Sequence, residues 1–334
     1  MKKVAIIGAG LQAKRRLPAI LEDQDFEVKW MIDLISEKAE KLAKQCGAKT
    51  QTDWHSAVGD KETDVVLVLT YPDSHREISV AAMENGKDVL CEKPLTKTEK
   101  EANEVVKTAK ATKRILKCGF NHRHHPGIEE AYKLFKNRTI GKPLFGRSRY
   151  GIAGRAGLEK EWRSNPKIIS GGQLMEQGMH LVDLYRWFLG EPEKATGFVS
   201  TNFWPIKPLE DNGFGLIQFK NNVTVSIHSS LTQWINLFEF EIFGEKGSIA
   251  VQGLGGAYGV EKLLVNLHDP DGPFSFKTTE FRGHDLSWKK EWEEFKDAIN
   301  TRKEPMATAF DGLRAIEIVN AIYESSKTGK AVKI

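Results

Sequence analysis

Hydrophobic residues in the first 120 positions come in short runs that alternate with amphipathic segments. Five runs have the length and content of buried strands: Val4–Ile7, Val28–Ile32, Val65–Leu69, Val89–Leu90 and Ile115–Phe120. Between them, helical spacing occurs notably at Leu11–Leu21, Ser36–Cys46, Ser74–Asn85 and Thr98–Lys113. Strands that alternate with helices of this length indicate a parallel sheet covered on both faces. We therefore predict an α/β domain with a doubly wound parallel sheet over residues 1–120.

The pattern changes after about residue 145. A helix is predicted from Gln173 to Leu189, and strands then follow at Ala195–Trp204, Gly213–Phe219, Val223–Leu231, Leu237–Phe243 and Lys262–Leu267. Turn signals rather than helices separate these strands, which favours a mostly antiparallel sheet. Two helices near Ser287–Asn300 and Thr308–Ser325 close the chain. We predict that residues 121–334 form an α/β domain with a large open sheet, whose last helix packs back towards the first domain.

A glycine-rich turn directly follows the first predicted strand. In Gly8-x-Gly10-x-x-Ala13, the first glycine permits a tight turn, the second lets the backbone approach a pyrophosphate, and the alanine allows close packing of helix on strand. The pattern alone is weak in a chain with 29 glycines. Its place between a strand and a helix favours a dinucleotide over a merely structural turn. The residues expected to hold the cofactor here are Gly8, Gly10, Leu11 and Gln12.

An acidic residue stands at the end of the second predicted strand. Asp33 follows Gly8 by 25 residues, near the spacing of about 20 at which a carboxylate binds the adenosine ribose hydroxyls. Such a carboxylate would repel a 2′-phosphate, so NAD is favoured, while Lys38 nearby leaves NADP open. The alternative is a helix N-terminal acid ahead of Ser36–Cys46.

Composition and charge narrow the class of protein. A chain of 334 residues predicts roughly two domains. Its 40% hydrophobic and 28% charged content is ordinary for a soluble globular protein, and the net charge of +4 is spread along the chain, so we expect no nucleic-acid partner and no membrane. The apolar run before Gly8 is too short for a signal peptide. Cys46, Cys91 and Cys118 form no CxxC pair, which is typical of a reduced cytoplasmic protein.

Several short motifs occur together in this chain. They are Thr70-Tyr71-Pro72-Asp73-Ser74-His75, Glu92-Lys93-Pro94, Asn121-His122-Arg123, Glu161-Trp162-Arg163, and Gly171-Gly172 leading into Glu176-x-x-x-His180-Leu181-x-Asp183. With the glycine-rich turn, they make the chain resemble the Gfo/Idh/MocA family of oxidoreductases (glucose-fructose oxidoreductase, inositol dehydrogenase and relatives) over nearly its whole length. The resemblance implies a dinucleotide-binding Rossmann domain, a second α/β domain for substrate binding and oligomerisation, and a cis bond at Lys93-Pro94.

The resemblance also implies which residues meet the cofactor and the substrate. Ligands of open parallel sheets bind beyond the carboxyl ends of the strands, where Glu92 and Lys93 stand. Lys93 would touch both the substrate and the nicotinamide side, whereas the plain alternative is an exposed lysine at a strand end. The further residues expected to contact the cofactor are Thr70, Tyr71, Pro72, His75, Glu92, Lys93, Asn121, Trp162 and Arg163.

Three polar residues of the helix predicted at 173–189 carry further candidate chemistry. Glu176, His180 and Asp183 are spaced i, i+4 and i+7, which places them on one face of a regular helix. The plain alternative is a solvated stripe. The resemblance implies instead that the stripe faces the nicotinamide, with His180 as acid/base and Glu176 or Asp183 orienting it. The family usually has aspartate at the position of Glu176.

The run His122-Arg123-His124-His125 invites comparison with a metal site. The chain has no partner cysteines and no HExxH pattern, and hydride transfer with a nicotinamide needs no metal, so we predict none. We expect instead a loop at the domain junction, with Arg123 or His124 facing an anionic or polyhydroxylated substrate. The residues expected to bind the substrate are Lys93, Arg123, Glu176, His180, Asp183 and His284.

The predicted function is hydride transfer between a nicotinamide cofactor and a sugar, polyol or nucleotide-sugar, with interconversion of alcohol and ketone. Its catalytic residues would be Lys93, His180 and Glu176. The alternatives are an NAD-dependent redox-assisted glycosidase, a non-catalytic nucleotide-binding regulator and, last, reduction of a tetrapyrrole. We also expect a homo-dimer or homo-tetramer through the outer face of the second sheet, because apolar residues occur on both alternating sets of its strands.

Overall fold

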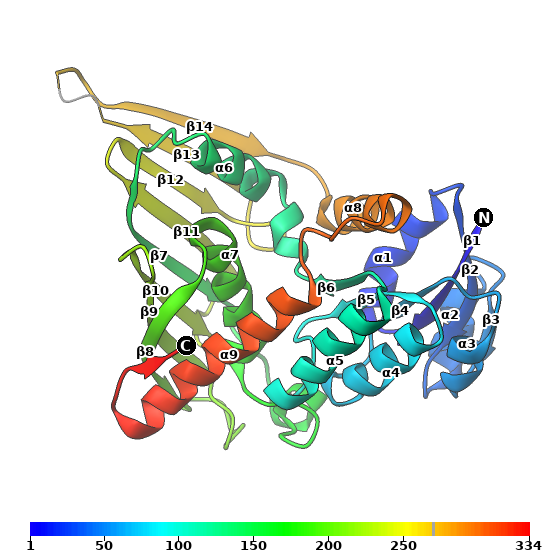
Figure 1. Ribbon diagram of the computed structural model, residues 1–334. Coiled ribbons are helices and arrows are strands. Elements are labelled where there is room, and N and C mark those ends of the chain that lie inside the picture. Colours follow the sequence, from blue (N-terminus) through cyan, green and yellow to red (C-terminus); the bar gives the residue numbers. More distant parts are fainter. Residues whose placement is uncertain (269–270) are drawn as a thin grey trace. The chain divides into compact units, whose positions relative to one another are not determined.

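Figure 1 shows the computed structural model of the chain, which describes residues 1–268 and 271–334. The chain divides into two compact units: unit 1 is Met1–Phe120 with Trp288–Arg314, and unit 2 is Asn121–Ser287 with Ala315–Ile334. The first division falls where the sequence analysis ended the first domain. The expected second domain ran without interruption to residue 334, whereas residues 288–314 belong to unit 1.

Unit 1 is built on six parallel strands in the order β3-β2-β1-β4-β5-β6. The strands are β1 (Lys2–Ile7), β2 (Phe26–Ile32), β3 (Lys49–Gln51), β4 (Val65–Val68), β5 (Asp88–Glu92) and β6 (Leu116–Gly119). The helices are α1 (Leu11–Leu21), α2 (Ser36–Ala43), α3 (His55–Gly59), α4 (Pro72–Glu84), α5 (Glu99–Thr112) and, apart from its first residue, α8 (Ser287–Thr301). The predicted doubly wound parallel sheet is confirmed, and the short elements β3 and α3 were not predicted.

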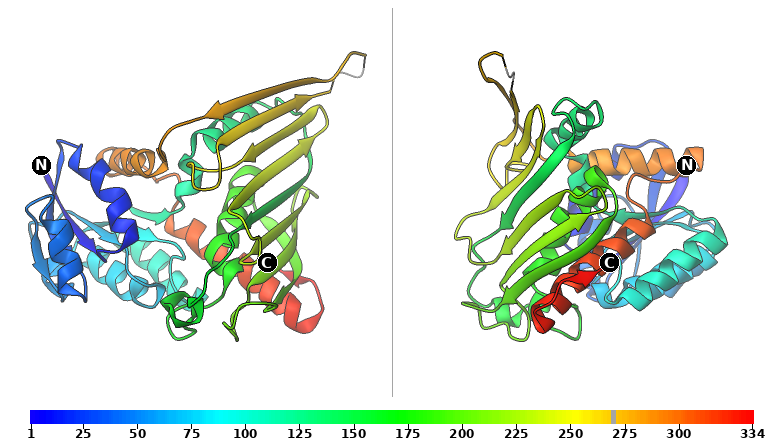
Figure 2. Two further views of the ribbon diagram at one scale, coloured as in Figure 1. Left: turned by 180° about the vertical axis from the view of Figure 1, so that it is seen from behind. Right: turned by 60° about the vertical axis from the view of Figure 1, so that its left-hand side comes forward.

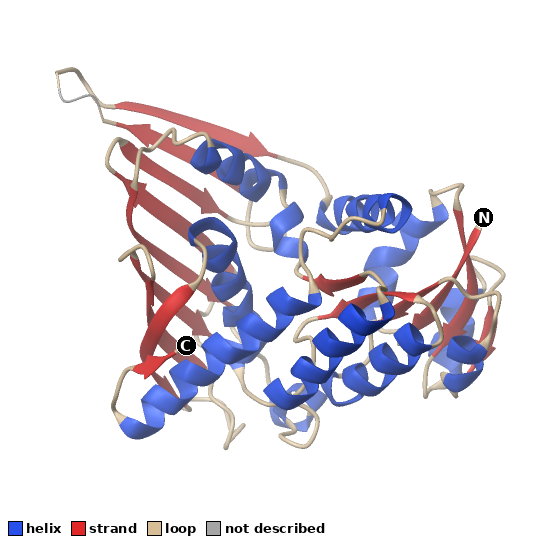
Figure 3. Cartoon of the chain, viewed as in Figure 1, coloured by secondary structure: helices blue, strands red, loops and turns tan. Residues whose placement is uncertain are grey.

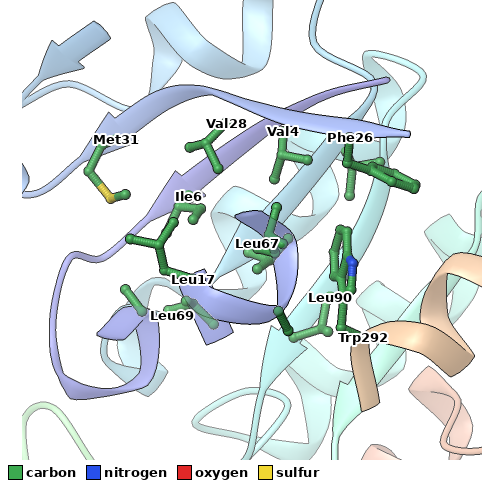
Figure 4. Close-up of a cluster of buried hydrophobic side chains, with 14 of the residues drawn as sticks. Val4, Ile6, Leu17, Phe26, Val28, Met31, Leu67, Leu69, Leu90 and Trp292 are labelled. Atoms are coloured by element: carbon green, nitrogen blue, oxygen red, sulfur yellow. The ribbon is translucent and has the colours of Figure 1, made fainter. Parts of the chain in front are cut away.

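The core of unit 1 explains why its central strands read as unbroken apolar runs. Figure 4 shows Val4, Ile6, Leu67 and Leu90 from neighbouring strands packed in one cluster, together with Trp292. These side chains are buried, as expected for strands covered on both faces. Trp292 lies on α8 and meets the ring of Phe26 edge to face, with 4.9 Å between centroids. The returning segment 288–314 thus completes this core.

Unit 2 contains a nine-stranded sheet in the order β14-β13-β12-β11-β7-β10-β9-β8-β15. The strands are β7 (Pro143–Gly151), β8 (Pro192–Ser200), β9 (Asn212–Phe219), β10 (Thr224–Ser230), β11 (Leu237–Gly244), β12 (Gly247–Gln252), β13 (Glu261–Leu267), β14 (Ser275–Phe281) and β15 (Val332–Lys333). Neighbouring strands of this sheet are antiparallel except β7 and β10, which are parallel. The predicted open, mostly antiparallel sheet is confirmed (Figure 3).

The helices of unit 2 gather on one face of this sheet. Figure 2 shows α6 (Pro126–Lys136), α7 (Met179–Leu189) and the later part of α9 (Ala309–Thr328) on that face in both views. Side chains alternate accordingly along β7: a Cβ on Gly146 would meet the Tyr185 ring of α7 at 2.7 Å, while Phe145 and Arg147 on either side are exposed. The opposite, outer face therefore carries the exposed positions.

One local prediction in unit 2 was incomplete and another was wrong. The chain is helical from Gln173 to Leu189, as predicted, but Leu174–Gly178 is one π-helical turn and the regular helix α7 begins at Met179. The strand expected to reach Trp204 ends at Ser200, because the buried carboxylate of Asp211 accepts three backbone N–H groups of the following segment, from Asn202, Phe203 and Trp204. Those bonds curl the chain into a loop.

Candidate active site

The glycine-rich turn of unit 1 has the geometry of an anion site. Gly8 has φ +101°, and a Cβ there would lie 2.5 Å from the carbonyl oxygen of Leu69, so only glycine fits. Gly10 is the N-cap of α1 and provides no side-chain cap. Buried Ala13 allows the helix to pack closely. The helix N-terminus thus offers its N–H groups to a ligand, with exposed Leu11 and half-buried Gln12 beside the turn.

Asp33 is fixed directly behind this turn. One carboxylate oxygen accepts the backbone N–H of Ala9 at 2.8 Å, and the other accepts that of Ile35 at 2.9 Å. The first bond joins the end of β2 to the glycine-rich turn, and the second shapes the approach to α2. The sequence offered two alternatives for Asp33: a residue that binds the cofactor beside the turn, or an acid ahead of a helix. The position of its side chain is compatible with both.

His75 braces the ends of β4 and β5. It is buried on α4, with Nδ1 2.9 Å from the carbonyl oxygen of Pro94 and Nε2 3.1 Å from that of Thr70. Burial alone would lower the pKa of His75, but the neighbouring Cys91 sulfur and the two carbonyls outweigh it and raise the pKa to about 9. A protonated ring donates to both carbonyls. Both ring nitrogens are occupied by backbone carbonyl oxygens, and the expected contact of His75 with the cofactor stays a prediction.

Glu92 belongs to a buried ionic cluster. Its carboxylate lies 2.5 Å from Arg16 of α1, and the same guanidinium lies 2.8 Å from Glu291 of α8. Trp288 covers Arg16 at 4.5 Å from ring centroid to guanidinium carbon. Glu92 therefore holds the end of β5 through an ion pair inside unit 1, and its expected contact with the cofactor stays a prediction. Sequence reasoning overlooked Arg16 and Glu291, which belong to no motif.

Lys93 follows this anchored residue at the carboxyl end of β5. Its side chain is half-buried, and its bond to Pro94 is cis, as the resemblance implied. Thr70, exposed Tyr71 and buried Pro72 stand at the corresponding end of β4, where Pro72 begins α4 and the Ser74 hydroxyl donates to the Thr70 hydroxyl at 2.7 Å. Strands β1, β4 and β5 are neighbours, so the glycine-rich turn, Thr70 and Lys93 share one edge of the sheet.

In unit 2, Arg123 and Asp183 neutralise each other. Both are buried, and the guanidinium donates to the carboxylate through two bonds of 2.8 and 2.5 Å. This bidentate pair joins the 3-10 turn Asn121–His124 to α7. Because Asp183 is buried, the alternative of a solvated stripe does not hold for it, and the expected contacts of Arg123 and Asp183 with a substrate stay predictions.

His180 is buried in a small aromatic group. Its ring stacks on that of His122, with 3.7 Å between centroids and 19° between planes. His122 is hydrogen-bonded through Nδ1 to the Asn121 amide oxygen at 3.1 Å and through Nε2 to the Tyr150 hydroxyl at 3.0 Å. The 3-10 turn, α7 and β7 thus each contribute one ring to this group.

Glu176 lies on the π-helical turn, one turn before His180. Its carboxylate is 3.4 Å from Nε of Arg163, whose guanidinium lies over the Trp162 ring at 4.3 Å from the centroid. Trp162 packs against a small buried cluster that includes Leu158 and Ile206. The Glu161-Trp162-Arg163 motif therefore meets Glu176 within unit 2, an association that the sequence did not predict.

Two adjacent glycines let the π-helical turn approach Glu210. A Cβ on Gly171 would lie 2.1 Å from the Tyr323 hydroxyl, and one on Gly172 would lie 2.1 Å from the Glu210 carbonyl oxygen. The buried Glu210 carboxylate accepts N–H groups of Gly172 and Leu174 and the Tyr323 hydroxyl, at 2.7–2.9 Å. Burial raises the pKa of Glu210 despite these donors. The two glycines of the Gly171-Gly172 motif are thus required by close packing against Tyr323 and Glu210. No sequence motif indicated either of these two partners.

Of the remaining candidate histidines, His125 borders the His180 group: its ring meets that of His122 edge to face, with 5.5 Å between centroids. His125 lies 3.2 Å from Glu261, which also accepts the N–H of Gly127 at 2.5 Å near the start of α6. His284 is exposed in the loop before α8. Over residues 1–268 and 271–334, no cluster of histidine, cysteine or acidic side chains is arranged for a metal ion. In the same residues, no helix is long and apolar enough to cross a membrane.

Known proteins share both units. The model of an oxidoreductase family with an NAD-binding Rossmann fold matches residues 2–120, and that of the GFO/IDH/MocA C-terminal domain matches residues 128–250. The 1,5-anhydro-D-fructose reductase of Ensifer adhaerens is 26% identical, over 100% of this chain and 99% of its own. Inositol 2-dehydrogenase of Salmonella typhimurium is 23% identical, over 98% and 95%. A solved levoglucosan dehydrogenase in complex with NADH has a TM-score of 0.90 at 25% identity, over 100% of this chain and 99% of that one.

Proposed function

The chain belongs to the Gfo/Idh/MocA family of oxidoreductases, and from that premise we propose that it interconverts an alcohol and a ketone on a sugar or polyol with NAD. The observation that carries this proposal is the shared edge of unit 1, where the uncapped start of α1, Thr70 and Lys93 all follow the carboxyl ends of neighbouring parallel strands. The names of the relatives, a sugar reductase, a polyol dehydrogenase and an anhydrosugar dehydrogenase, support the substrate class.

The residues of unit 1 fit a dinucleotide. The N–H groups at the start of α1 would hold the pyrophosphate, and Asp33 would accept the adenosine ribose hydroxyls. When bound, the nicotinamide supplies or accepts the hydride. Trp162, Arg163 and Asn121 of unit 2 remain proposed cofactor contacts on the strength of the family resemblance.

In this proposal, Lys93 stabilises charge on the substrate oxygen and His180 transfers the proton. The Lys93 ammonium donates a hydrogen bond to the substrate oxygen and stabilises its developing negative charge. His180 accepts the hydroxyl proton in oxidation and returns it in reduction. Glu176, whose carboxylate pairs with Arg163, lies one helical turn before His180 and would orient it. His180 is an imidazole, the side chain that most often serves as general acid and base.

A panel of sugars, polyols and nucleotide-sugars, read by NADH absorbance, tests this function. With the substrate found, Lys93→Met and His180→Asn should each lower kcat, the histidine change by roughly 10²–10⁴-fold. NADH affinity should change far less. Sugar release without net NADH would indicate the redox-assisted glycosidase, and binding of NADH without turnover would indicate a regulator. A tenfold preference for NADPH over NADH, about 1.4 kcal/mol, would contradict the role of Asp33.

We also propose that the outer face of the unit 2 sheet pairs with a second copy of the chain, as a homo-dimer or part of a homo-tetramer. This face contains an open groove of about 820 Å³ lined by Arg149, Phe198, Phe214, Leu216 and Glu239 among others. Arg147 pairs with Glu241 and Arg149 with Glu239, so rows of both charges run beside apolar rings. Such a surface is complementary to itself.

We further propose that the protein works in a reducing compartment such as the cytoplasm. Its three cysteines are free thiols, which is the usual state of cysteines in such a compartment.

A further inference from the structure

The function described so far gives no role to His122, although the histidine-rich segment is buried in unit 2. Its ring lies flat on that of His180, at 3.7 Å and 19°. Face-to-face contact of this kind fixes the plane of the partner ring and prevents it from tilting. A base that must meet a substrate hydroxyl at hydrogen-bond distance depends on such a fixed orientation.

Hydrogen bonds hold His122 at both nitrogens and define its direction of donation. The Asn121 amide donates through Nδ2 to the Ser287 hydroxyl at 3.0 Å, so its oxygen accepts from Nδ1 of His122 at 3.1 Å. In the neutral ring, Nε2 then accepts from the Tyr150 hydroxyl at 3.0 Å. With His122 neutral, the chain of bonds runs in one direction from Tyr150 to Ser287, and each bond polarises the next.

The aromatic rings around Tyr150 keep this arrangement in place. Its ring meets Phe238 of the neighbouring strand β11 edge to face at 5.3 Å and Tyr258 at 5.1 Å. The Tyr258 hydroxyl in turn accepts the Gln177 amide at 2.9 Å. His122 is thus anchored to the sheet on one side and supports α7 on the other.

We propose that His122 is a positioning residue for proton transfer: its neutral ring fixes the plane of His180 and stabilises the positive charge that His180 gains when it takes a proton from an alcohol. This inference rests on the proposed acid/base role of His180. The face of a neutral aromatic ring attracts a cation, and the attraction is stronger where water is excluded. A charged His122 would instead repel a protonated His180, so in this role Nε2 of His122 is the acceptor of the Tyr150 hydroxyl.

Three variants separate positioning from general stability. His122→Ala removes the ring, while His122→Phe keeps a flat ring without the hydrogen bonds. Tyr132→Ala is the matched control, because Tyr132 of α6 stacks on Trp187 of the same helix α7 at an equal spacing of 3.7 Å, with 13° between planes. All are compared by thermal melting, NADH affinity, and kcat and KM for alcohol oxidation on the substrate that the panel identifies.

His122→Ala should lower kcat by roughly 10-fold or more, with NADH affinity within about twofold of wild type, while His122→Phe recovers most of the loss. Tyr132→Ala should lose thermal stability but not kcat. The stack is checked without substrate by NMR, where the carbon-bound ring protons of His180 should shift in His122→Ala and not in Tyr132→Ala.

Full kcat in His122→Ala, an equal loss in His122→Phe, or unshifted His180 signals would each overturn the proposal. His180→Asn, measured in parallel, distinguishes this failure from failure of the proposed function. If His180→Asn is inactive while His122→Ala is unimpaired, only the role of His122 is refuted. If His180→Asn also keeps its turnover, the acid/base assignment itself is refuted.

Discussion

Gly8 and Gly10 stand two positions apart but are glycines for different reasons. A Cβ on Gly8 would strike the backbone of Leu69, and its φ of +101° is unfavourable for other residues. A Cβ on Gly10 would meet no atom of the described residues within 4 Å. The fold therefore requires the first glycine, whereas the second leaves open the space in front of α1 where a pyrophosphate would lie.

Alanine substitutions should separate these two requirements. Gly8→Ala should lower the free energy of unfolding by at least about 1–2 kcal/mol, the cost of a left-handed conformation. Gly10→Ala should leave it unchanged but weaken NADH binding tenfold or more, about 1.4 kcal/mol. Urea unfolding and titration calorimetry measure the two quantities. Normal NADH affinity in Gly10→Ala would place the pyrophosphate elsewhere.

Arg16 shows a residue role that no motif could reveal. It stands between two carboxylates, Glu92 of β5 and Glu291 of α8, and Glu291 is 275 positions away in the chain. Burial raises the pKa of Glu291, although the positive charges of Arg16 and Lys117 oppose the rise. The single positive charge of Arg16 thus faces two carboxylates. For one of them, Glu291, burial disfavours the charged form.

This imbalance predicts unequal effects of two substitutions. Arg16→Met should cost about 3–5 kcal/mol of unfolding free energy, because it leaves buried carboxylates without their partner. Glu291→Gln should cost much less, since it removes a charge that burial disfavours and leaves the Arg16–Glu92 pair intact. Urea denaturation of both variants checks the order. The opposite order would mean that Glu291 is the essential partner.

Among the elements, the π-helical turn Leu174–Gly178 is the one that regular spacing misrepresents. The i, i+4, i+7 rule assigned Glu176, His180 and Asp183 to one face of a regular helix, but Glu176 lies in a wider turn that precedes α7, where this spacing does not apply. Such turns occur frequently at functional sites. Here Glu210 holds the turn from outside, by accepting N–H groups at its start.

Adding one methyl group should disturb this turn. In Gly172→Ala the new Cβ would lie 2.1 Å from the carbonyl oxygen of Glu210, and neither backbone can yield easily. We expect a loss of about 1–3 kcal/mol in stability, as for other overpacked sites, together with reduced turnover because His180 follows the turn. Thermal melting and kcat measure both. Gly59→Ala, where a Cβ meets no described atom within 4 Å, is the control and should melt like wild type.

Strand β7 shows why part of the second sheet was not predicted. It contributes Tyr150 to the His180 group, yet its sequence from Pro143 to Gly151 contains two glycines and two arginines and lacks an apolar run. Two of its inward positions, Gly146 and Ser148, are small, and Gly146 makes room for the Tyr185 ring. The first domain was easier, because buried parallel strands are apolar throughout. Motifs located Lys93 and His180, but partners such as Arg16, Glu210 and Tyr323 depend on tertiary contacts.

At the scale of the whole molecule, the outer face of the unit 2 sheet combines exposed aromatic residues with paired charges. Phe198 and Phe214 are exposed by 71% and 47%. Phe214 also stacks on His228, with 4.0 Å between ring centroids. Exposed apolar surface of this kind, bordered by polar residues, is typical of protein–protein contacts.

A charge introduced on this face should prevent self-association. We expect light scattering of the wild-type protein to give a mass at least twice the 37.6 kDa of one chain. Phe198→Glu combined with Leu216→Glu should give a single chain, because the added carboxylates would be buried against a second copy. The substitution Phe276→Glu, on exposed strand β14, is the control. A wild-type protein that stays at 37.6 kDa at every concentration would refute the proposed pairing.

Unit 1 is built from two segments that lie far apart in the chain, and this has a consequence for its folding during synthesis on the ribosome. Its parallel sheet is encoded by the first 120 residues, but Trp292 and Glu291 arrive only with the segment 288–314. At about 5–20 residues per second, that delay is roughly 10–40 s. During it, the nascent sheet exposes the apolar surface that α8 later covers, and Arg16 lacks one of its carboxylates. The dinucleotide-binding half of the chain, although translated first, can therefore complete its core only when the chain is almost finished.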